Sequence, residues 1–131
     1  MNQKFSEMAD RLMELPQAIS EIQLEILERT EASKQVQDKI TTIESKIKAD
    51  INNAVDANGK KVYSNAEARE AAFIEDANEN QELIDLKKDY DYSQREISEK
   101  RIEIERLSND QRNIRSLLNF FANNLETADQ I

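Results

Sequence analysis

The sequence contains 27 acidic residues but no histidine and no cysteine, which narrows the chemistry that its side chains could perform. Histidine is the commonest general base and metal ligand, and cysteine supplies nucleophiles and disulfides. A carboxylate di-metal site in a helical bundle also needs Glu-x-x-His motifs, and acids two positions apart do not share a helix face. We therefore expect no catalytic residue, no metal site, no cofactor and no small-molecule substrate. The acidic groups that we interpret as solvated surface are Glu75, Asp76 and Glu79, Asp89 and Asp91, and Glu103 and Glu105.

One segment approaches the spacing of a calcium-binding loop. Asp56, Asn58 and Glu67 fall at the first, third and twelfth positions of such a loop. The fifth and sixth positions would then be lysines, where calcium needs an oxygen ligand and the loop needs a glycine. We predict instead a turn in which Gly59, the single glycine, ends the preceding helix in a left-handed conformation.

A heptad repeat predicts the elements that carry these residues. Apolar residues recur at alternating spacings of three and four in both halves of the chain, which is typical of a coiled coil and separates this sequence from a disordered chain of similar charge. The first half carries Phe5, Met8, Leu12, Leu15, Ile19, Ile22, Ile26, Val36, Ile40, Ile43, Ile47 and Ala54. The second half carries Leu83, Leu86, Tyr90, Ile97, Ile104, Leu107, Ile114, Leu118, Phe121, Leu125 and Ala128.

The predicted fold is all-α: a long antiparallel coiled-coil helical hairpin with a short helix at its tip. One domain over 1–131 fits the length, and one glycine and one proline are too few for the turns of a sheet protein. We expect a first long helix over 5–55, kinked near Pro16, a tip loop and short helix over 56–80, and a second long helix over 81–128. Ser64 and Glu67 have the spacing of a capping box for the short helix.

The polar interruptions of the repeat suggest a register for the hairpin. In an antiparallel pair, facing residue numbers have a constant sum, and a sum of 140 places Ile43 against Ile97. The same register places Arg29 against Gln111, which would form a polar layer that fixes the alignment.

Two surfaces of the expected hairpin are candidates for binding. The tip carries basic, aromatic and amide side chains, which we predict to contact a protein partner: Lys60, Lys61, Tyr63, Asn65 and Arg69. The opposite end carries apolar residues outside the heptad seam, which we predict to mediate self-association as a dimer: Leu24, Leu27, Leu117 and Phe120. Exposed apolar clusters usually mark association, and docking of a different partner there is the alternative.

The net charge of −9 disfavours direct binding to nucleic acid. An acidic helical rod could instead imitate a nucleic-acid duplex, but the charge is spread over the whole chain, which favours a solvated surface. No segment approaches the roughly 18–20 apolar residues of a membrane span, and the first residues lack a signal-peptide core. We expect no membrane partner and a cytoplasmic location.

The stretch from Asn58 to Arg69 contains a Lys-x-x-Tyr-Ser-Asn-x-x-x-Arg segment. It resembles a segment of small helical proteins from phages and prophages of Gram-positive bacteria, which tend to be encoded among early genes for DNA metabolism. The shared positions include Tyr63, Asn65 and Arg69. The resemblance implies a phage origin and an accessory role, in the host cytoplasm, and it carries over no catalytic residue.

The expected function is therefore non-enzymatic binding to another protein. Given the resemblance, the partner would be a nucleic-acid-processing enzyme of host or phage. The protein would act as a replication or recombination accessory, or as an inhibitor of a host nuclease or defence complex. The alternative is a coiled-coil scaffold or assembly protein of a virion.

Overall fold

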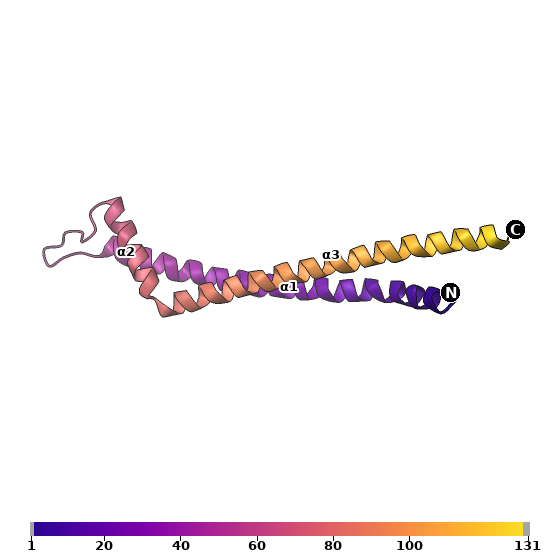
Figure 1. Cartoon of the computed structure of the whole chain (residues 1–131). Coiled ribbons are helices and arrows are strands. Elements are labelled where there is room, and N and C mark those ends of the chain that lie inside the picture. Colours follow the sequence, from indigo (N-terminus) through magenta and orange to yellow (C-terminus); the bar gives the residue numbers. More distant parts are fainter. Residues whose placement is uncertain (1, 130–131) are drawn as a thin grey trace. The chain divides into compact units, whose positions relative to one another are not determined.

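The protein consists of three α-helices in a computed structural model that describes the backbone of residues 2–129 and the side chains of residues 3–124. Helix α1 spans Asn2–Asn53, α2 spans Ala66–Glu79 and α3 spans Gln81–Asp129 (Figure 1). The long α1 packs antiparallel against the long α3, with the short α2 between them in the chain. This arrangement confirms the predicted all-α helical hairpin. None of the helices in the described part of the chain has a stretch apolar enough to cross a lipid bilayer.

Helix α1 continues through Pro16 without a break. Proline removes one backbone hydrogen bond and costs about 3 kcal/mol in a helix interior. The seam is well packed on both sides of this position, since Leu15 is fully buried and Ile22 is also buried. We attribute the continuity of α1 to this packing.

The chain divides into two compact units, one formed by residues 1–29 and 96–131 and the other by residues 30–95. The core of the first unit takes one apolar stripe from each long helix. Its buried side chains are Leu15, Ile22, Ile97 and Ile114. The predicted core positions Leu125 and Ala128 lie outside the residues whose side chains are described.

The core of the second unit contains all three helices. Ile40 of α1, Ala77 of α2 and Leu83 of α3 form a buried cluster. Partly buried side chains pack against this cluster: Val36, Ile43, Ile47, Phe73, Leu86 and Tyr90. Ile51 of α1 lies outside the heptad seam and is nevertheless only 4% exposed. Helix α2 therefore covers part of α1 that a two-helix hairpin would leave in solvent.

The register of the two long helices differs from the predicted one. Polar contacts between described side chains that join α1 to α3 include Arg11–Asp110, Glu25–Lys100 and Arg29–Glu96 in the first unit, and Ser33–Gln94 in the second. The residue numbers of these pairs add to between 121 and 127, so the predicted sum of 140 is wrong by about two heptads. Arg29 accordingly contacts Glu96 and not Gln111.

This error has a physical cause. A shift by whole heptads leaves every apolar position in the seam, so the heptad pattern alone does not distinguish one such register from another. Helix α2 favours the observed register, because it packs on the last turns of α1. The predicted register placed the start of α3 on those turns. As a result Ile43 packs against the cluster that contains Leu83, and not against Ile97.

Asp56 stabilises the loop that follows α1 through hydrogen bonds of its backbone amide and its carboxylate. The Asp56 amide donates a hydrogen bond to the Lys60 carbonyl (2.8 Å), and the Asp56 carboxylate accepts from the amides of Asn58 (2.8 Å) and Lys60 (3.0 Å). Gly59 has φ +79°, which confirms the expected left-handed conformation. Its predicted role as the cap of α1 is wrong, because α1 ends at Asn53 and Gly59 lies inside this later turn.

Helix α2 begins one residue later than the capping-box spacing predicted. The Asn65 side chain, and not Ser64, caps the helix by accepting from the Ala68 amide (2.8 Å). The Asn80 side chain caps α3 in the same way by accepting a hydrogen bond from the Leu83 amide (2.9 Å). Asparagine and serine are comparable N-caps, so the sequence did not distinguish these adjacent positions.

Candidate functional site

The second unit contains a hollow between α1 and α2, which we call the tip recess. Its volume is about 390 Å³. The lining residues are Lys48, Ile51 and Asn52 from α1 and Arg69, Glu70 and Phe73 from α2. Pockets that bind small groups typically have volumes of roughly 300–1,000 Å³, so the tip recess is large enough for one or two side chains of a partner.

Three of the five residues predicted to bind a partner make contacts that hold the tip together. The Lys61 ammonium donates to the Asn52 carbonyl at the end of α1, and Asn65 caps α2. The Arg69 guanidinium donates to the Tyr63 carbonyl over 3.4 Å. Lys60 is exposed and Tyr63 is half-buried. The structure thus places all five residues in one unit and assigns positioning contacts to three of them.

The tip recess combines an apolar floor with a basic rim. Ile51 is buried, and the Lys48 ammonium lies 4.9 Å from the centroid of the Phe73 ring, which is a cation–π distance. Lys48 and Arg69 supply two positive charges to the lining and Glu70 supplies one negative charge. This arrangement can receive an apolar side chain of a partner while the rim pairs with a neighbouring carboxylate.

Sequence reasoning missed Lys48 and Ile51 as contributors to this site. A signal for Ile51 was present, because this isoleucine lies outside the heptad seam close to the end of the first helix. On a two-helix hairpin this position predicts an exposed side chain, whereas α2 covers Ile51 in the structure. The location of α2 on α1 depends on tertiary packing, which the local sequence does not specify.

The four residues predicted to mediate self-association are all exposed, but they do not form one cluster. Leu24 is 58% exposed and precedes Glu25, which contacts Lys100 of α3. Leu117 is 46% exposed and shares a hollow with Met8 and Arg11. Since an α-helix rises 1.5 Å per residue, the positions of α1 beside these two leucines are roughly 24 Å apart. The four residues would form one cluster only in the predicted register. Leu117 and Phe120 are neighbours on α3 in either register.

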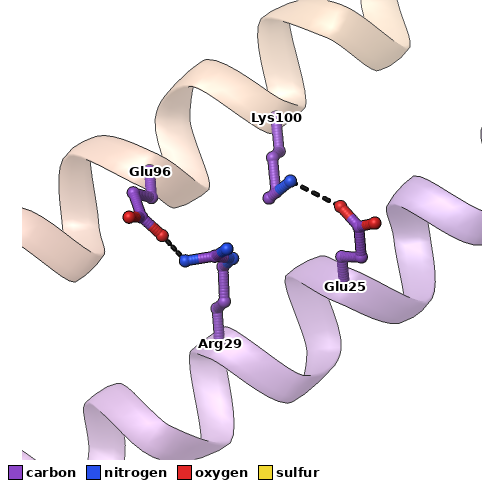
Figure 2. Close-up of polar contacts among 4 residues, drawn as sticks. All are labelled: Glu25, Arg29, Glu96 and Lys100. Atoms are coloured by element: carbon purple, nitrogen blue, oxygen red, sulfur yellow. Dashed lines mark hydrogen bonds and ion pairs between the residues drawn. The ribbon is translucent and has the colours of Figure 1, made fainter.

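Charged residues in the seam of the first unit reach outward to flanking partners. Figure 2 shows Glu25 and Arg29 of α1 pointing toward Lys100 and Glu96 of α3. The hydrogen bond and the positive charge of Lys100 hold the pKa of Glu25 below its ordinary value of about 4.5. Because both pairs are partly exposed, we expect them to specify register more than to add stability.

These observations define an all-α protein with an antiparallel pair of long helices and a recess built by a third, short helix. Comparison with protein-family models, with curated proteins and with solved structures finds no match. Among the residues with described side chains, no three acidic, histidine or cysteine side chains come together as metal ligands would.

Proposed function

We propose that the protein is a non-enzymatic accessory protein that binds another protein through the tip recess. The observation that carries this proposal is the construction of the recess. Contacts made by Lys61, Asn65 and Arg69 fix the loop and α2 on the end of α1. They hold an apolar floor beneath two cations before any partner arrives. Such preorganisation lowers the entropy cost of binding.

The partner that we propose is a nucleic-acid-processing enzyme of a bacterial host or of a phage, in the host cytoplasm. The segment from Asn58 to Arg69, which resembles the phage proteins, makes up most of the tip loop and the first turn of α2. In this segment Asn65 and Arg69 support the recess wall. The net charge of −9 makes a protein partner more favourable than nucleic acid itself. Binding would assist a replication or recombination enzyme, or block a nuclease or defence complex.

A capture experiment with a charge reversal tests this proposal. Lys48→Glu reverses one charge on the rim of the recess, and Lys34→Glu makes the same change two heptads earlier on an exposed position of α1. We expect wild type and Lys34→Glu to retain the same protein from a Gram-positive bacterial lysate, identified by mass spectrometry. Lys48→Glu should retain about tenfold less, because a rim cation is replaced by a repelling charge.

A second variant makes the opposite change of charge in the recess. Glu70→Lys removes the one acid from the lining of the recess, and we expect it to increase capture of the same protein. Circular dichroism should show equal helicity for all variants. Equal capture by wild type and Lys48→Glu would contradict the proposed contact surface. Recovery of the chain alone, in assemblies that grow with concentration, would favour the virion scaffold.

A further inference from the structure

The charged side chains around the tip recess are sorted by sign. Helix α2 carries five acidic residues and one basic residue, which gives this helix a net charge of −4. The single base, Arg69, lines the recess, whereas Glu70 is the only one of the five acids that does so. On the last turns of α1, Lys48 lines the recess and the nearby acid Asp50 does not. A hollow with a positive lining therefore lies in a chain of net charge −9.

Both cations of the recess retain hydrogen-bond donors for an occupant. The Arg69 guanidinium has five N–H donors, one of which donates to the Tyr63 carbonyl over 3.4 Å. The Lys48 ammonium has three donors and lies over the Phe73 ring. Within the part of the chain whose side chains are described, neither cation forms an ion pair. These donors favour an anionic occupant, because hydrogen bonds between two charged groups are about twice as strong as neutral ones.

The floor of the recess requires an apolar group as well. Ile51 is buried, and Phe73 packs against the core cluster of the second unit. The core therefore holds both side chains in place before an occupant arrives. An anion alone would leave this floor in water, whereas an apolar side chain beside the anion removes apolar surface from water at about 25 cal/mol per Å². The lining thus matches an apolar side chain that is adjacent to a carboxylate.

We propose that the segment of the partner protein held by the tip recess is short and acidic, with a large apolar side chain next to an aspartate or glutamate. This rests on the proposed function, because it specifies the chemistry of the partner at the same site. The apolar side chain packs on Ile51 and Phe73. The adjacent carboxylate accepts hydrogen bonds from Lys48 and Arg69.

The charge beyond the recess favours a peptide over a nucleic acid as the occupant. A nucleic-acid strand carries a negative charge at every nucleotide, so the phosphates on either side of the recess would approach the other acids of α2. These acids are Glu67, Glu75, Asp76 and Glu79. A peptide can carry its acids at the recess alone and be neutral beyond it. Charge complementarity therefore selects an acidic segment of a protein.

Binding of synthetic peptides to the full chain tests this proposal. The probe is a short, fluorescein-labelled peptide with blocked ends, in which one phenylalanine lies between aspartates. We expect it to bind wild type with a dissociation constant below about 1 mM, measured by fluorescence anisotropy. Replacing its aspartates by asparagines, or its phenylalanine by serine, should weaken binding at least about fivefold in each case. Added salt should weaken binding of the aspartate peptide and not of the asparagine peptide.

Variants of the chain locate the peptide in the recess. Lys48→Met removes a rim charge and retains a long side chain, and Lys34→Met makes the same change at an exposed position of α1 outside the recess. We expect Lys48→Met to weaken binding of the aspartate peptide about fivefold and to leave binding of the asparagine peptide unchanged. Lys34→Met should change neither. Glu70→Gln should strengthen binding of the aspartate peptide, because it removes the one acid from the lining.

Three results would overturn the proposed chemistry of the occupant. These are equal binding of the aspartate and asparagine peptides, no binding of the aspartate peptide below about 1 mM, and tighter binding of single-stranded oligothymidine than of this peptide. The proposed function has a separate test, because it requires only that capture of a protein from lysate depends on Lys48. A capture that still depends on Lys48 would leave that function standing after any of the three results.

Discussion

Single polar side chains in this protein act mainly by fixing the positions of others. Asp56 binds two amides of its own loop, and Asn65 and Asn80 each cap a helix. Lys61 and Arg69 each donate to a backbone carbonyl. All of these are contacts from a side chain to the backbone. Aspartate and asparagine are residue types favoured in turns and at helix caps, whereas nothing in the sequence indicated the contacts of Lys61 and Arg69. Lys61, Asn65 and Arg69 are also predicted to bind a partner, and this remains a prediction, because composition does not distinguish a cation that contacts a partner from one that supports a loop.

The Glu25–Lys100 pair predicts a pH dependence. The pKa of Glu25 lies below about 4.5 in the folded chain, because Lys100 hydrogen-bonds to its carboxylate and attracts its charge. Between the folded and unfolded pKa values the unfolded chain binds more protons, so stability rises with pH in that window. The contribution is present above pH 4.5 and is lost as the pH falls through the folded pKa.

A carbon-detected NMR titration of the Glu25 carboxyl measures this pKa directly. Lys100→Met removes the charge and the hydrogen bond while retaining a long apolar side chain at the seam position. We expect the pKa of Glu25 to rise toward its ordinary value in this variant. An unchanged pKa would show that the ion pair does not persist in solution.

At the scale of elements, the sequence predicted the helices well and their alignment poorly. Two long heptad repeats are sufficient to predict two long helices and the face that each buries. They do not fix the register, because a shift of two heptads exposes no apolar seam position. They also do not place α2, whose Phe73 and Ala77 join the core of the second unit. The tip recess could not be predicted for the same reason, since α2 forms one of its walls.

The cap of α2 gives a prediction at this scale. Asn65→Ala should lower the free energy of unfolding by about 1 kcal/mol, because the amide of Ala68 loses its partner. Asn78→Ala makes the same change at an exposed position inside α2 and should raise that free energy by up to about half a kcal/mol, since alanine has the higher helix propensity. Urea denaturation followed by circular dichroism measures both. Equal effects of the two substitutions would contradict the capping role.

At the scale of the molecule, the two candidate binding surfaces belong to different units. The tip recess depends on α1 and α2 in the second unit, and the hollow beside Leu117 depends on α1 and α3 in the first. Within each unit, the surface follows from how the helices are aligned. The register of α1 against α3 sets the hollow beside Leu117 directly, and it bears on the tip recess through α2, which ends one residue before α3 begins.

Disulfide trapping measures this register most directly, because the chain has no cysteine of its own. Cysteines at 43 and 83 in the second unit, and at 12 and 114 in the first, face each other in the register of the structure. Cysteines at 43 and 97, and at 26 and 114, face each other only in the register with a sum of 140. We expect rapid intramolecular oxidation of the first two pairs and not of the other two, measured by mass spectrometry of monomeric chain. Preferential oxidation of the 43–97 and 26–114 pairs would contradict the account.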